Sequence, residues 1–267
     1  MKKDNRPIGI FDSGLGGLTV VAALRSVLPH EDIVYLGDSA RVPYGNKSVE
    51  NIKRFGAEDC KFLLKKGVKT IIVACNTVSA VAISDLKSEF TSVPILDVLT
   101  SGVNACIREK PEYVAVIGTR ATVNSDAYRM QIHKIMPEIA VKSIACPLFV
   151  PLAEEGLTEG PITASVIEHY LGELLSKHPD LLLLGCTHYP LLKKYLRTFM
   201  PEPVKIIDSA IACAEFAAEY IKENKLLAGD LKKGEERYYV TDMASDFYVQ
   251  ASRFLGYRIG HVEKVSL

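Results

Sequence analysis

Two stretches decide the fold class: IIVACNT at residues 71–77 and LLLLGCTH at residues 181–188. Each is an apolar run that stops at a cysteine and continues in polar residues. Short apolar runs of this kind are typical of strands buried inside a parallel sheet, and the polar residues that follow fit a strand-to-helix junction. The two stretches predict an α/β protein with a cysteine at the carboxyl end of each of two buried strands.

Similar apolar runs recur along the chain, and helical patterns separate many of them. The predicted strands cover residues 7–11, 33–36, 69–74, 113–117, 141–144, 181–184, 204–207 and 238–240. The predicted helices include residues 17–27, 48–65, 77–89, 162–176, 190–199 and 209–223. Because strands alternate with helices, we expect mainly parallel sheets flanked by helices.

The chain also repeats itself loosely. IGIFDS at 8–13 resembles VAVIGT at 114–119, a step of 106 residues, and Cys75 precedes Cys186 by 111 residues. We therefore expect two pseudo-symmetric α/β lobes with the active site in the cleft between them. The first lobe would comprise residues 1–97 plus 210–267, and the second residues 98–209. Chance resemblance between buried strands is the alternative explanation of the repeat.

Composition excludes several classes of protein and favours a small-molecule partner. The 267 residues are 48% hydrophobic and 24% charged, which is ordinary for a globular protein. Lys+Arg and Asp+Glu number 32 each, so no overall field attracts nucleic acid or a membrane surface. The start, MKKDNRPIGIF, lacks the apolar core of a signal peptide, and no run approaches the length of a membrane span. These features predict a cytoplasmic protein.

Cysteine usage indicates reduced thiols and no metal. The six cysteines lie at positions 60, 75, 106, 146, 186 and 213, with no CxxC pair and no export signal. A structural zinc site is therefore not expected. Free cysteine often serves as a small buried hydrophobic residue, and we interpret Cys60, Cys106, Cys146 and Cys213 in that way.

Cys75 and Cys186 differ from the other four in context. Both stand at a predicted strand-to-helix junction, followed by Asn76-Thr77 and Thr187-His188. A thiol at a helix start feels unpaired backbone N–H groups, which favour the thiolate and can also bind a carboxylate. Inverting a carbon that carries hydrogen requires a base on one face and a proton donor on the other. Two such thiols facing one another across a cleft would meet that requirement.

The segment Asp12-Ser13-Gly14-Leu15-Gly16-Gly17 follows the first predicted strand and precedes a helix, a position where open α/β sheets bind ligands. A dinucleotide fingerprint fails because the third glycine would fall at Thr19. Asp12 and Ser13 could contact a ligand or could only cap a tight turn.

Two functions of other classes stay open at this point. Cys186 beside His188 could be the nucleophile and base of a hydrolase, although that leaves Cys75 without a role. A non-catalytic ligand-binding protein of the doubly wound type is the other alternative.

Five motifs resemble the glutamate racemase family, in the expected order from about residue 7 to beyond 210. They are IGIFDSGLGGLTV (8–20), DSARVPYG (38–45), ACNT (74–77), FVPLAEEG (149–156) and LLGCTHYP (183–190). Relatives acting on aspartate or hydantoins share the two cysteines, so the motifs indicate the reaction type more specifically than the substrate.

The resemblance implies two pseudo-symmetric α/β lobes and a racemase that uses no pyridoxal phosphate or other cofactor and supplies D-glutamate for peptidoglycan. It assigns removal of the α-proton of D-glutamate to Cys75 and that of L-glutamate to Cys186. It assigns assistance to the thiols or the substrate ammonium to Asp12, Glu154 and His188. The implied substrate-binding residues are Asp12, Ser13, Tyr44, Gly45, Asn76, Thr77, Thr119, Thr122, Thr187 and His188.

Several of these residues have a simpler explanation on sequence alone. Tyr44 and Gly45 could form only a turn, Glu154 could be a solvated acid, and Thr119 and Thr122 could cap a helix. Some relatives are dimers and some are activated by a cell-wall precursor, so a homodimer and such an effector are further expectations.

Overall fold

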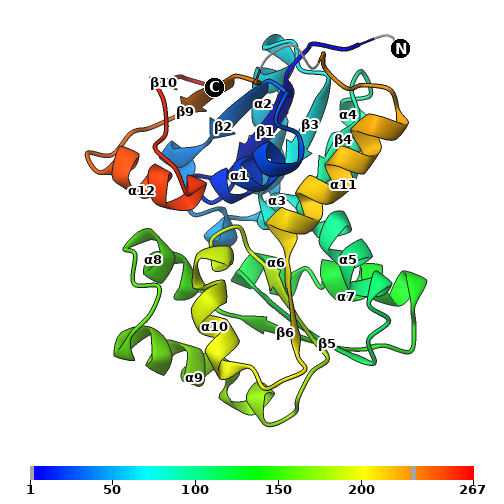
Figure 1. Ribbon diagram of the computed structural model, residues 1–267, viewed down its shortest axis with the longest axis vertical. Helices are drawn as coiled ribbons and strands as arrows, with labels where there is room; N and C mark the ends of the chain where they lie inside the picture. Colours follow the sequence, from blue (N-terminus) through cyan, green and yellow to red (C-terminus); the bar gives the residue numbers. More distant parts are fainter. Residues whose placement is uncertain (1–2, 230–232) are drawn as a thin grey trace.

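A computed structural model describes residues 3–229 and 233–267 and contains two parallel β-sheets flanked by helices (Figure 1). Residues 1–2 and 230–232, all within the predicted first lobe, lie outside the described residues. The α/β fold class predicted from the apolar runs is confirmed. We call the six-stranded sheet with its helices the first half, and the four-stranded sheet with its helices the second half.

The first sheet has the strand order β10-β9-β2-β1-β3-β4. Its strands are β1 (Ile8–Asp12), β2 (Ile33–Gly37), β3 (Thr70–Val73), β4 (Ile95–Asp97), β9 (Glu236–Val240) and β10 (Val262–Lys264). All neighbouring strands pair in parallel. β1, β2 and β3 are buried along their whole length, as their apolar sequences require.

The second sheet has the strand order β6-β5-β7-β8, again entirely parallel. Its strands are β5 (Tyr113–Gly118), β6 (Ala140–Ala145), β7 (Leu181–Gly185) and β8 (Lys205–Asp208). The order of second, first, third and fourth strand is the same as in β2-β1-β3-β4 of the first sheet. The two repeated sequence pairs therefore occupy equivalent places, β1 with β5 and β3 with β7, and chance is no longer needed to explain the repeat.

Helices join the strands and cover both sheets. They are α1 (Leu18–Val27), α2 (Val49–Lys65), α3 (Asn76–Val81), α4 (Ile83–Glu89), α5 (Val98–Arg108), α6 (Arg120–Asn124), α7 (Ala127–Ile135), α8 (Phe149–Glu154), α9 (Pro161–Leu175), α10 (Lys193–Phe199), α11 (Ser209–Glu223) and α12 (Phe247–Leu255), with single turns at Ser39–Arg41, Tyr44–Asn46 and Tyr189–Leu192. The single helix predicted at 77–89 is wrong: it breaks at Ala82, between β-branched Val81 and Ile83, which disfavour helix. Among the described helices, none is both long and apolar enough to cross a membrane.

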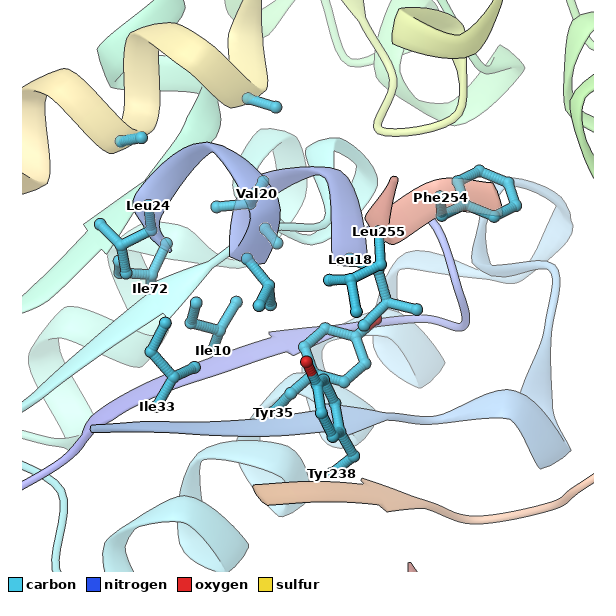
Figure 2. Close-up of a cluster of buried hydrophobic side chains, with 14 of the residues drawn as sticks. Ile10, Leu18, Val20, Leu24, Ile33, Tyr35, Ile72, Tyr238, Phe254 and Leu255 are labelled. Atoms are coloured by element: carbon cyan, nitrogen blue, oxygen red, sulfur yellow. The ribbon is translucent and has the colours of Figure 1, made fainter. Parts of the chain in front are cut away.

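The core of the first half lies between its sheet and the helices α1, α11 and α12. Figure 2 shows Ile10 and Ile72 from the strands meeting Leu24 of α1, and Leu255 of α12 approaching Leu18 and Tyr238. These side chains are at most 4% exposed. The packing attaches the C-terminal helix α12 to the first half of the molecule.

Two helices connect the halves. Asp97 at the end of β4 caps α5 by accepting a hydrogen bond from Thr100 N at 2.7 Å, and Asp208 at the end of β8 caps α11 by accepting from Ala210 N at 3.0 Å. α5 packs against β7 and β8 of the second half, whereas α11 packs against α1 of the first. The two helices also pack against one another, so the chain crosses between the halves at one place (Figure 1).

Candidate active site

Cys75 and Cys186 occupy equivalent positions and line the same pocket. Cys75 follows β3 and is the N-terminal cap residue of α3, and Cys186 follows β7 directly. Both are buried, with exposed fractions of 4% and 5%. The pocket between them has a volume of about 530 Å³. Parallel strands present their carboxyl ends on the same edge of a sheet, and here the ligand-binding edges of both sheets contribute to one cavity.

Most of the residues predicted for the site line this pocket. They are Ser13, Tyr44, Gly45, Cys75, Asn76, Thr77, Thr119, Glu154, Cys186, Thr187 and His188. Asp12 and Thr122 do not line it. Asp12 lies behind Ser13, buried, and accepts a hydrogen bond from Gly14 N at 3.2 Å. Thr122 lies behind Thr119, with 3.0 Å between their hydroxyl oxygens.

Burial has the largest effect on the pKa of the Cys75 thiol. Removal from solvent and, to a smaller extent, the nearby Asp12 carboxylate raise its pKa to about 12, against opposing hydrogen bonds. The thiol donates to the Ser13 hydroxyl oxygen at 3.7 Å. Burial therefore outweighs the hydrogen bonds at the helix start that favour a thiolate. Cys75 is a thiol at neutral pH.

Cys186 has a different partner, the imidazole of His188. His188 Nδ1 lies 3.9 Å from Cys186 Sγ, and His188 Nε2 lies 3.1 Å from Glu154 Oε1. Burial lowers the pKa of His188, but the hydrogen bonds to Cys186 and Glu154 raise it more, to about 10. His188 is therefore an imidazolium at neutral pH, with one N–H directed at the sulfur and the other at the carboxylate.

Two buried polar atoms near the thiols have no hydrogen-bond partner within residues 3–229 and 233–267. They are Asp12 Oδ1, an acceptor, and Asn76 Nδ2, a donor. The Asn76 amide is oriented by Tyr128 of α7, whose hydroxyl donates to Asn76 Oδ1 at 2.5 Å. Buried polar groups are normally paired, so the unpaired Asn76 amide nitrogen, which belongs to a residue lining the pocket, points to a ligand that accepts its hydrogen bond. Asp12 lies behind Ser13 rather than in the pocket wall.

Tyr44 and Gly45 do more than form a turn. The Tyr44 hydroxyl donates to Asp38 and lies 3.3 Å from Asp59 Oδ2, and both carboxyl groups are fully buried. A Cβ placed on Gly45 would lie 3.0 Å from Thr119 Cβ, a tight contact, so glycine eases the close approach of this loop to the second half. Thr119 and Thr77 meet across the pocket, with 3.1 Å between their hydroxyl oxygens. Thr119 also caps α6, because its hydroxyl oxygen accepts a hydrogen bond from Thr122 N at 3.2 Å. The same residue therefore caps a helix and lines the pocket.

A second close approach between the halves lies at Gly16. A Cβ at this position would lie 2.2 Å from Thr187 Oγ1 and 2.5 Å from His188 Nδ1. Thr19, the residue that broke the dinucleotide pattern, donates to the backbone oxygen of Thr187 at 3.1 Å. The glycine-rich segment after β1 therefore supports the loop that carries Cys186.

Sequence reasoning missed a further group of lining residues. They are Val42, Pro43, Asn46, Arg120, Pro147, Leu148, Val150, Pro151 and Tyr170. Arg120 carried the clearest signal, because it stands between two predicted site residues, Thr119 and Thr122, at the end of a strand. Tyr170 carried none, because it lies within α9, far in the sequence from every motif.

Comparison with known proteins identifies the family of this chain. The sequence profile of the family described as Asp/Glu/Hydantoin racemase matches residues 18–217. The glutamate racemase of Syntrophus aciditrophicus (strain SB) is 45% identical over 262 residues, which cover 98% of this chain and 97% of that protein.

Solved structures are similar along nearly the whole chain. Glutamate racemase from Francisella tularensis subsp. tularensis SCHU S4, crystallised with D-glutamate, has a TM-score of 0.92 at 45% identity, covering 98% of both chains. Escherichia coli glutamate racemase, in complex with L-glutamate and the activator UDP-MurNAc-ala, has a TM-score of 0.77 at 26% identity, again covering 98% of both chains. The protein described here belongs to the Asp/Glu/hydantoin racemase family and, within it, to the glutamate racemases.

Proposed function

We propose that this chain interconverts L- and D-glutamate by moving a proton at Cα, with Cys75 and Cys186 acting on opposite faces of the substrate. The reaction is that of the family to which the chain belongs. The observation that carries the two-thiol mechanism is the pair of equivalent cysteines lining one pocket, one a buried thiol and the other beside an imidazolium.

Substrate binding uses the unpaired polar atoms around the thiols. The Asn76 amide nitrogen and backbone N–H groups at the start of α3 donate to the α-carboxylate. The Asp12 carboxylate balances the ammonium, assisted from the pocket wall by Ser13. Burial raises the pKa of Asp12 in the free protein, and an adjacent ammonium lowers it again, so binding favours the ionised carboxylate. Tyr44, Gly45, Thr77, Thr119 and Thr187 complete the set of proposed substrate-binding residues, and Thr122 supports Thr119 from behind the pocket wall.

The reaction of L-glutamate begins at Cys186. Its thiolate takes the α-proton, so the Cα–H bond breaks, an S–H bond forms and the electron pair stays on the substrate, delocalised into the α-carboxylate. The Cys75 thiol then gives its proton to the opposite face of Cα. Cys75 ends as thiolate and Cys186 as thiol, so the reverse reaction of D-glutamate starts at Cys75. His188 and Glu154 stabilise the Cys186 thiolate, and Asp12 lies near Cys75.

Several finer expectations accompany this proposal. The division into residues 1–97 plus 210–267 and residues 98–209 is supported by the packing of α5 on the second half and of α11 on the first. Supply of D-glutamate for peptidoglycan follows from the family's role. Independence from cofactors, a cytoplasmic location, a homodimer and an effector resembling a cell-wall precursor stay predictions.

The test is incubation of purified protein with L-glutamate or L-aspartate in D2O, with chelator present and no cofactor added. We expect loss of optical rotation and deuterium at Cα on glutamate, followed by polarimetry and NMR. The same signals on aspartate alone would support racemisation as the reaction and contradict glutamate as the substrate. Folded protein that exchanges the α-proton of neither substrate would contradict the racemase proposal. That result would favour a hydrolase or a binding protein.

A further inference from the structure

The C-terminal helix α12 belongs by its packing to the first half (Figure 1). Two of its residues, Arg253 and Phe254, nevertheless contact Glu154 and His188 of the second half. We propose that Arg253 and Phe254 are positioning residues for the Glu154–His188 pair and, through it, for the Cys186 thiolate. This inference rests on the proposed racemase function and concerns only one of its two thiols.

Arg253 holds the backbone that carries Glu154. Its Nη1 donates to the Glu154 carbonyl oxygen at 2.6 Å. That carbonyl ends α8, where a cation satisfies an otherwise unpaired oxygen and the negative end of the dipole. Gly156 makes the approach possible, since it has a φ of 74° and a Cβ there would lie 2.6 Å from Arg253 Cζ. The guanidinium therefore fixes the turn from which the Glu154 side chain reaches His188.

Phe254 holds the imidazole itself. Its ring centroid lies 5.0 Å from that of His188, with an interplanar angle of 76°, an edge-to-face contact. Phe254 is 3% exposed, so this contact is sealed from solvent. Figure 2 shows Phe254 directed away from Leu255, whose side chain enters the core of the first half. Both residues belong to the apolar core of the first half, and Phe254 also contacts His188 of the second.

The Cys75 side is built differently. The hydrogen bond of the Cys75 thiol goes to Ser13, which belongs to the same half and follows β1. Cys186, in contrast, depends on His188, His188 on Glu154, and both on a helix from the other half. Loosening α12 should therefore slow proton transfer at Cys186 and leave proton transfer at Cys75 largely intact.

Comparing rates in the two directions cannot reveal this asymmetry. The enantiomers are equally stable, so kcat/KM must remain equal in both directions for every variant. The α-deuterium isotope effect on kcat/KM is informative, because the label on L-glutamate is removed at Cys186 and the label on D-glutamate at Cys75. When the Cys186 step becomes more rate-limiting, the isotope effect rises for L-glutamate and falls for D-glutamate.

The experiment measures both isotope effects in Arg253→Ala, Arg253→Lys and Phe254→Leu. Arg253→Ala should lower kcat about tenfold with little change in KM, since displacing a catalytic group by about 1 Å can slow a reaction about a hundredfold. Arg253→Lys keeps a cationic donor and should recover part of the rate. Arg258→Ala is the matched control, because it removes an exposed guanidinium from the same C-terminal segment.

The expected result is a larger isotope effect for L-glutamate and a smaller one for D-glutamate in Arg253→Ala and Phe254→Leu, with Arg258→Ala matching the unmodified protein. An Arg253→Ala protein that matches Arg258→Ala would overturn the inference. So would isotope effects that move together for both enantiomers, because these would indicate a general structural defect. Absence of racemisation in the unmodified protein would instead overturn the proposed function.

Discussion

The two halves of the molecule place their cysteines at equivalent positions but surround them with different side chains. Both thiols follow the third strand of a sheet with the same strand order. The Cys75 thiol is kept protonated by burial, with a pKa of about 12, whereas Cys186 lies 3.9 Å from an imidazolium nitrogen. The repeated fold therefore determines where the two groups lie, whereas the side chains around them differ. In the proposed reaction of L-glutamate, Cys186 is the base and Cys75 the acid.

The largest effect should come from removing either thiol. Cys75→Ser and Cys186→Ser should each lower racemisation by about 10³-fold in both directions, since general acid–base catalysis typically contributes about 10²–10⁴-fold and a serine hydroxyl is a far weaker acid than a thiol. Polarimetry with both enantiomers is the measurement. Cys60→Ala, which removes a buried thiol outside the pocket, is the control and should keep the rate. Substantial activity in either serine variant would break the two-thiol account.

Removing the imidazolium should affect Cys186 and leave Cys75 unchanged. His188→Asn should lower kcat about 10²-fold, because asparagine can donate a hydrogen bond to Cys186 but carries no charge to stabilise its thiolate. The thiolate absorbance of the folded protein at neutral pH should fall in parallel. Ser13→Ala, the matched change beside Cys75, should leave this absorbance unchanged. Equal absorbance in His188→Asn and the unmodified protein would show that Cys186 needs no cationic partner.

A smaller effect is expected behind Tyr44, in a buried cluster of the first half. Asp38 accepts hydrogen bonds from Tyr44, from Arg41 and, at 2.8 Å, from Thr241. Asp38→Asn should raise the KM for glutamate about tenfold by freeing the Tyr44–Gly45 loop, since a hydrogen bond to a charged group contributes about 1.5–3 kcal/mol.

Asp59→Asn is the matched control for Asp38→Asn. Burial raises the pKa of Asp59 well above its usual range, and asparagine keeps the shape of its side chain. The KM of Asp59→Asn should stay near that of the unmodified protein, because Asp59 lies 3.3 Å from the Tyr44 hydroxyl and makes the longer of the two contacts, and thermal melting would verify that both variants fold. A larger rise in KM for Asp59→Asn than for Asp38→Asn would contradict the role given to Asp38.

The smallest effect is a pH dependence. The pKa of His188 is raised from its usual value to about 10, so the imidazolium persists through neutral pH and is lost as pH rises through about 10. At that pH, kcat/KM for L-glutamate should fall to about half of its plateau, because half of His188 is neutral. Dividing by the profile of His188→Asn removes the titration of the substrate ammonium. A ratio that is flat across this range would contradict the assigned protonation of His188.

The sequence predicted those parts of the fold and site that depend on local pattern. The buried strands β1, β3, β5 and β7 carry continuous apolar runs, and both cysteines stand directly after such runs. β4 and β10 were not predicted, because three residues are too few to show a period. The boundaries of the longer helices were near their predicted positions because capping and composition are local properties.

Tertiary packing decided what the sequence could not predict. The pKa of Cys75 is raised mainly by burial, which the local pattern of a helix start does not reveal. Asp12 and Thr122 were predicted beside the substrate and lie one layer behind the pocket wall. Arg253 and Phe254 stand in an ordinary amphipathic helix, and nothing in that pattern indicates contact with Glu154 and His188.

The most direct test of two unequal thiols on opposite faces is the position of the label at the start of the reaction in D2O. With L-glutamate as substrate, the first D-glutamate formed should be fully deuterated at Cα, because its new proton comes from the solvent-exchanged Cys75 thiol. The remaining L-glutamate should still carry its original hydrogen. Early D-glutamate that retains the substrate hydrogen would show that one group serves both faces, and would contradict the account.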